Sequence, residues 1–300
     1  MTVCLQLQLL TNVKKGTKML QNFKTYLLGA SLLLFSMISA SSAYANLLIT
    51  PLQVVFKARE RTTEIVLVNT SRDTNTYRLV WEQLDQVDVA GGYVPAEDSV
   101  RKERQDLEDF AVFTPRQITL KPGDKQTIRI AVRRPKDLED GEYKSHLKFS
   151  IVPDLTIKED LEQDVSEDEI GLAAKVYASY SIPVVYRVGD VDLDIKIGTP
   201  KFSRSPKTSQ ILLDFPVERS GKHGVIGMIK VYHTPNGGKE SEIGALGNAN
   251  LFSEINSRDF TIITNQTALS PGKLRIVFQR AEGAISDYTV LAEKTFPVGN

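Results

Sequence analysis

The sequence predicts an all-β protein with two β-sandwich domains that follow a cleaved export signal. Three observations predict it: apolar residues alternate with polar ones at period two over most of the chain, turn-forming residues separate these runs, and an apolar stretch near the N-terminus follows a basic one. With 300 residues, 41% of them hydrophobic, the chain is long enough for about two such domains.

The N-terminal segment has the three parts of a secretory signal peptide. Its apolar part, residues 26–38, is about 13 residues long, whereas a membrane span needs roughly 20. Ser41 to Ala45 then supply the small-x-small pattern that signal peptidase cuts. We therefore expect residues 1–45 to be removed, the mature chain to begin at Asn46, and the protein to reach the periplasm of a Gram-negative bacterium. An uncleaved anchor is the alternative, and Met19 is an alternative start. The basic part consists of Lys14, Lys15, Lys18 and Lys24.

Period-two alternation predicts half-buried strands within residues 127–133, 143–151, 211–217 and 274–278, because successive strand side chains point to opposite faces of a sheet. Turn signals lie between such runs, at residues 91–92, 121–124, 140–141, 235–238 and 271–272. Helical periodicity is weak, and the best candidate, residues 97–109, is predicted as a short helix or a charged loop.

The boundary between the domains is predicted at Gly189-Asp190, with about seven strands on either side. This gives an N-terminal domain of residues 46–188 and a C-terminal domain of residues 189–300. Both have the usual size of an immunoglobulin-like β-sandwich.

Composition and motifs favour a binding protein over an enzyme. Lys plus Arg and Asp plus Glu both total 37, which gives no basic stripe for nucleic acid. Cys4, the only cysteine, lies in the predicted signal peptide, so the mature chain has no disulfide or thiol ligand. His146, His223 and His233 lack metal-ligand spacing, and His146 is predicted on a strand surface. No nucleotide-binding or serine-hydrolase motif occurs. We therefore expect no catalysis, cofactor, metal or small-molecule substrate.

The first domain carries motifs in a fixed order at residues 49–56, 68–69, 113–123, 126–130, 140–143, 145–147 and 182–187. Together these motifs resemble the periplasmic chaperones of the chaperone–usher pilus pathway, the PapD-like proteins. The resemblance covers most of residues 46–188, whereas residues 190–300 share only the general strand pattern. It implies that the chain binds pilus or fimbrial subunits by donating an edge strand to them and delivers them to an outer-membrane usher.

The resemblance places the donor strand at about residues 172–187. One face of that strand would be apolar at every second position, as strand donation requires. The alternative is that this face packs inside its own sandwich. The residues of this predicted donor face are Leu172, Ala174, Val176, Ala178 and Tyr180.

The chain departs from the family at two positions. Well-known members hold the subunit's terminal carboxylate with two basic residues, and Pro51 and Pro183 stand at the matching places. Candidate substitutes for the missing cations are Arg59, Arg61, Lys175 and Arg187.

Glu142 and Arg187 match a structural ion pair at the domain interface of the family, which implies that they fix the angle between the domains. The alternative is an exposed pair worth less than about 1 kcal/mol. Two other functions remain open for the whole chain: an immunoglobulin-like structural or adhesive surface protein, and a β-sandwich binding protein or weak enzyme. Because residues 46–49 lead almost directly into the first strand, no free donor extension precedes it, which favours the chaperone.

Overall fold

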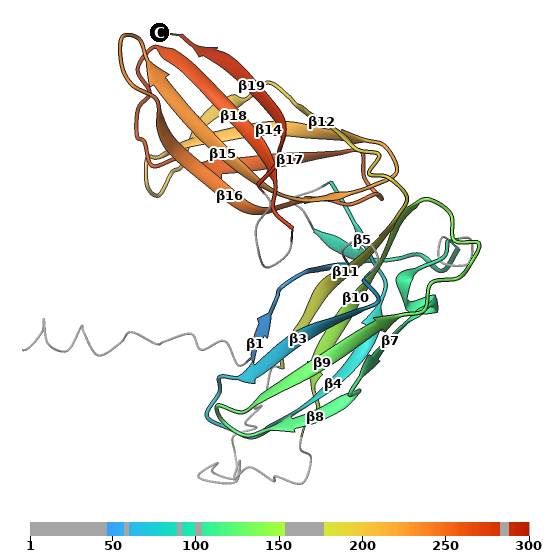
Figure 1. Ribbon diagram of the computed structural model, residues 1–300. Helices are drawn as coiled ribbons and strands as arrows, with labels where there is room; N and C mark the ends of the chain where they lie inside the picture. Colours follow the sequence, from blue (N-terminus) through green and yellow to red (C-terminus); the bar gives the residue numbers. More distant parts are fainter. Residues whose placement is uncertain are drawn as a thin grey trace, which may run out of the picture. The chain divides into compact units, whose positions relative to one another are not determined.

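The structure is a computed structural model that describes residues 47–56, 60–88, 92–99, 104–153, 177–282 and 288–299. The predicted signal peptide lies outside these residues. In the described part, no helix has the length and apolar character needed to span a membrane. Strands dominate, which confirms the predicted all-β class (Figure 1).

Two sheets form the first sandwich (Figure 1). One has the order β1-β3-β9-β7 and the other β2-β11-β10-β4-β8. The first sheet consists of β1 (Leu47–Thr50), β3 (Thr62–Asn69), β9 (Lys125–Val132) and β7 (Ala111–Thr114). The second consists of β2 (Val54–Val55), β11 (Ser179–Val188), β10 (Gly141–Ile151), β4 (Asn75–Glu82) and β8 (Gln117–Leu120). All pairs are antiparallel except β2 with β11.

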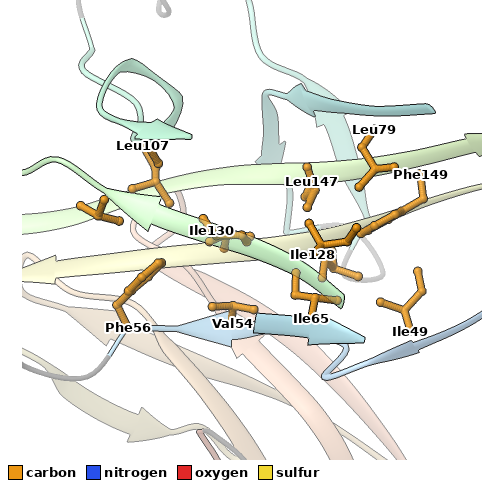
Figure 2. Packing of buried hydrophobic residues seen from close by; sticks show 14 of the residues in the cluster. Ile49, Val54, Phe56, Ile65, Leu79, Leu107, Ile128, Ile130, Leu147 and Phe149 are labelled. Atoms are coloured by element: carbon orange, nitrogen blue, oxygen red, sulfur yellow. The ribbon is translucent and has the colours of Figure 1, made fainter. Parts of the chain in front are cut away.

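The core of the first sandwich lies between these sheets (Figure 2). Ile65 and Ile128 reach it from β3 and β9, and Leu147 and Phe149 reach it from β10, all fully buried. Their positions follow the sequence alternation, because every second side chain of each strand points inward. Burial of such residues from both sheets holds the sandwich together.

The second sandwich also has two sheets. The first is built around β14, which pairs with β12, β13 and β17, and the second has the order β16-β15-β18-β19. Its own core includes Phe215, Phe260 and Phe278. The strands are β12 (Asp194–Ile197), β13 (Lys201–Arg204), β14 (Ile211–Ser220), β15 (Val225–Pro235), β16 (Ser241–Leu251), β17 (Ser257–Ile263), β18 (Gly272–Arg280) and β19 (Val290–Val298).

Two smaller elements interrupt the first sandwich. A hairpin of β5 (Leu84–Gln86) and β6 (Tyr93–Pro95) follows β4, and the 3-10 helix η2 (Leu107–Asp109) precedes β7. The sequence predicted a short helix or a charged loop over residues 97–109, of which residues 100–103 are outside the described part. Of this hairpin, the sequence predicted only a turn at residues 91–92.

Candidate strand-addition edge and interdomain joint

Among the described residues, one edge of β11 is open along its first half. β10 pairs with β11 from Ser179 to Val188, whereas β2 pairs with it only at Val184 and Val185 on the other side. In the described part of the chain, no strand pairs with residues 179–182 on the side away from β10. This stretch is therefore a sheet edge with backbone groups available for another strand.

The direction of these backbone groups follows from one hydrogen bond. The amide of Phe56 donates to the carbonyl of Val185 over 3.0 Å, so the polar backbone groups of Val185 face β2. In this ladder, backbone groups alternate in direction along the strand, and those of Ser181 and Ser179 face the same side as those of Val185. We call the backbone groups of Ser179 and Ser181 the open edge.

The predicted donor face changes from exposed to buried along β11. Ala178, just before the strand, is exposed, Tyr180 is half-buried against the first core, and Ile182 is 4% exposed. Tyr180 thus packs partly in its own sandwich. The remaining predicted donor residues, Leu172, Ala174 and Val176, lie outside the described residues.

The two prolines that replace the family's basic pair lie near this edge. Pro51 is half-buried in the bend between β1 and β2, where the chain passes from one sheet to the other. Pro183 lies in β11 next to the open edge, opposite His146 of β10.

In the described part of the chain, the cations predicted to substitute for the basic pair do not gather near Pro51 and Pro183. Arg187 is engaged by two carboxylates, and Arg61 is exposed before β3. Arg59 and Lys175 lie outside the described residues.

A cation that the sequence analysis missed lies on the neighbouring strand. Lys148 Nζ is 2.7 Å from Glu82 Oε1, and Ser181 Oγ donates to Glu82 Oε2 over 2.6 Å. Burial raises the pKa of Glu82, but the hydrogen bonds from Lys148 and Ser181 outweigh it and lower this pKa overall. The cation is thus already neutralised by a carboxylate of the same chain. The registers of β10 with β4 and with β11 bring these three residues together, which the sequence of one strand alone cannot reveal.

The far end of β11 enters a polar joint between the sandwiches. Arg187 Nε donates to Glu142 Oε2 over 3.0 Å, Nη1 to Glu282 Oε2 over 2.7 Å, and Nη2 to the Gly224 carbonyl over 2.9 Å. Glu142 also accepts the Gly224 amide at 3.0 Å. Burial lowers the pKa of Arg187, yet the carboxylates of Glu282 and Glu142 raise it overall. The pair predicted from the resemblance is thus buried, and the alternative of an exposed pair is wrong.

Apolar and amide contacts extend this joint. Val185 of the first sandwich packs with Ile226 and Phe252 of the second. Gln86 of the β5–β6 hairpin donates to the Asn250 carbonyl over 3.0 Å and accepts the Phe252 amide at 2.8 Å. The side-chain amide of Gln86 thereby pairs with the end of β16 much as a strand backbone would.

His146 is not on the surface, contrary to the sequence prediction. It is 1% exposed, and the ring of Tyr93 lies across it with centroids 5.1 Å apart. Neither ring nitrogen has a hydrogen-bond partner among the described residues. Burial, with a smaller effect of the Lys144 cation, lowers the pKa of His146 to about 3. The prediction failed because the hairpin covers the outward face of β10, which local alternation does not reveal.

The other two histidines are also buried in the structure. His223 accepts the Asp192 amide at Nδ1 and lies 3.1 Å from the Val188 carbonyl through Nε2, so it contacts both ends of the connection between β11 and β12. His233 contacts the Ser270 carbonyl at 3.0 Å. These roles are structural. Among the described residues, no group of three or more His, Cys, Asp or Glu side chains could hold a metal ion.

These features define an all-β protein of two sandwiches with an open strand edge on the first. No protein-family model matches the chain, and no curated protein matches it. Many solved structures are similar to it, including the following three. The YadV chaperone is 14% identical, with a TM-score of 0.41, over 85% of this chain and 100% of that chain. The E. coli chaperone DraB is 14% identical, with a TM-score of 0.39, over 84% and 95%.

The third is the Salmonella enterica SafA pilin in complex with the SafB chaperone, which is 12% identical, with a TM-score of 0.39, over 86% of this chain and 99% of that chain.

Proposed function

We propose that the mature chain is a periplasmic chaperone that binds pilus or fimbrial subunits by strand addition at the open edge and delivers them to an outer-membrane usher. The open edge of β11 is the observation that carries this proposal. The ordered motifs of the first domain that resemble pilus chaperones support it. Residues 1–45 act in this proposal as the cleaved export signal.

The proposed client is an immunoglobulin-like domain that lacks a strand. Such a domain exposes an apolar groove and unpaired backbone groups, which invite aggregation. Pairing with Ser179 and Ser181 would satisfy client backbone groups, and Ala178 would contribute a small exposed side chain at the groove. Affinity then comes mainly from main-chain hydrogen bonds.

The proposed binding mode does not depend on a basic pair for the client's carboxylate. Pro51 and Pro183 occupy those places, and the nearby Lys148 is neutralised by Glu82. Main-chain pairing therefore has a larger share of the proposed affinity than in family members with both cations.

The test is affinity capture from a periplasmic extract with two matched variants. Ser181→Pro removes one amide of the open edge, and β10 pairing should persist because this amide points away from β10. Ser181→Ala keeps the amide and removes only the hydroxyl. We expect the wild type and Ser181→Ala to recover a small immunoglobulin-like subunit in equimolar amount, and Ser181→Pro to lose it. Recovery of the same proteins by all three would exclude strand addition at this edge.

A further inference from the structure

The pairing of β11 with β2 stops at a proline. In the parallel register Val54↔Val184, the backbone of Val54 pairs with the carbonyl of Pro183 and the amide of Val185. The next donor toward the N-terminal end of β11 would be the amide of residue 183. Proline has no amide hydrogen, so this hydrogen bond cannot form.

If the pairing continued, the acceptor for this missing amide would be the Leu52 carbonyl, on the β2 side. Continuing the register by two residues places Leu52 beside Ile182, where the Leu52 carbonyl would accept from residue 183 and the Leu52 amide would donate to Ser181. Instead, residues 51–53 form a bend, and the Leu52 side chain is 61% exposed. β1 then pairs with β3 of the other sheet.

We propose that Pro183 is a ladder stop: it ends the pairing of β11 with β2 and so keeps Ser181 in the open edge. With an ordinary residue at this position, the chain's own residues 52–53 would extend the ladder and cover Ser181. Pro183 thus acts as a positioning residue, which determines where the protein's own pairing ends and where a partner strand begins. The ladder stop follows from the backbone alone, whereas its effect on binding rests on the proposed function.

Pro183→Ala tests this directly, because it restores the amide with little other change. The exported protein is purified from the periplasm, and amide hydrogen exchange is followed by nuclear magnetic resonance without any partner. We expect the new amide at position 183 to be strongly protected. The Leu52 amide should be protected as well, because it would donate to the Ser181 carbonyl. Pro183→Val is the second variant, with the same expectation. Rapid exchange at position 183 in a folded variant would overturn the proposal.

Binding is measured with an acetylated, amidated peptide of alternating valine and threonine, about eight residues long. Pro183→Ala is expected to bind it about tenfold more weakly than the wild type, because one edge residue is covered. Pro297→Ala is the matched control, since Pro297 lies on β19 of the second sandwich, and its affinity should equal that of the wild type.

A failure of the ladder stop can be distinguished from a failure of the proposed function. Tighter binding by Pro183→Ala would show that the new amide faces the partner, and the ladder stop would be wrong while strand addition stands. A protected amide at position 183 of Pro183→Ala, together with equal peptide binding by Ser181→Pro and Ser181→Ala, would support the ladder stop and contradict the proposed function.

Discussion

Arg187 and Glu142 are neighbours across the β10–β11 ladder, and their side chains meet at 3.0 Å in a joint where Glu142 is 0% and Arg187 10% exposed at the side chain. Glu142 accepts the Gly224 amide as well, and Arg187 donates to the Gly224 carbonyl. One ion pair of the first sandwich thereby satisfies both backbone groups of a residue in the second. Removal of Arg187 would leave the buried carboxylate of Glu142 without its cation, whereas removal of Glu142 would leave Arg187 paired with Glu282.

Arg187→Met should destabilise the protein by about 3 kcal/mol or more, because the carboxylates of Glu142 and Glu282 would be left buried without their cation. The measurement is the free energy of unfolding in urea. The control is Arg129→Met, which breaks the exposed Arg129–Glu64 pair on β9 and β3 and should cost at most about 1 kcal/mol. Equal costs for the two variants would contradict the structural role of the joint.

His146 should make the protein lose stability as the pH falls. Its pKa is about 3 in the folded state, against an ordinary value of 6.5, so the folded state binds fewer protons. The stability is present above about pH 6.5 and decreases below it by up to about 1.4 kcal/mol per pH unit until the folded pKa is reached. His146→Phe should remove this part of the slope. The wild type and His146→Phe are compared by the unfolding free energy that each loses between about pH 6.5 and about pH 4.5. Equal losses would contradict the burial of a neutral imidazole.

Gln86→Leu should loosen the joint while leaving each sandwich folded. The variant loses two hydrogen bonds to the end of β16 and leaves the buried Asn250 carbonyl and Phe252 amide with fewer partners, at a cost of about 2 kcal/mol. Differential scanning calorimetry should then resolve two transitions in place of one. A single transition at an unchanged temperature would show that Gln86 does not couple the sandwiches.

Phe149→Ala should destabilise the first sandwich by about 3–5 kcal/mol, because the fully buried ring fills the space between the two sheets. Val80→Ala on β4 is the control, since Val80 is 41% exposed, and its effect should be within about 0.5 kcal/mol. The unfolding free energy checks both. A small effect of Phe149→Ala would mean that this face of β10 is not in the core.

The sequence predicted the longer strands because their alternation is local. Leu147 and Phe149 on β10, and Leu213 and Phe215 on β14, point inward as the period-two pattern requires. Local alternation could not reveal β2, which has only two residues. Nor could it reveal that the chain passes from β1 in one sheet to β2 in the other. Both depend on contacts with distant strands.

The site was predictable only in part. The Glu142–Arg187 contact was expected from the resemblance, and the alternation of β11 indicated which side chains share a face. His146 was predicted on a strand surface, but Tyr93 from a distant segment covers it. The Lys148–Glu82 pair also needed the register of three strands.

The amide of Ser181 offers the most direct measurement of the central claim, that the open edge of β11 takes a partner strand. Its hydrogen exchange is compared in the purified protein and in the complex with the captured subunit. Strand addition predicts slow exchange in the complex and faster exchange in the free protein, with the Ile182 amide, which faces β10, protected in both. Equal exchange of the Ser181 amide in the two states would contradict the claim.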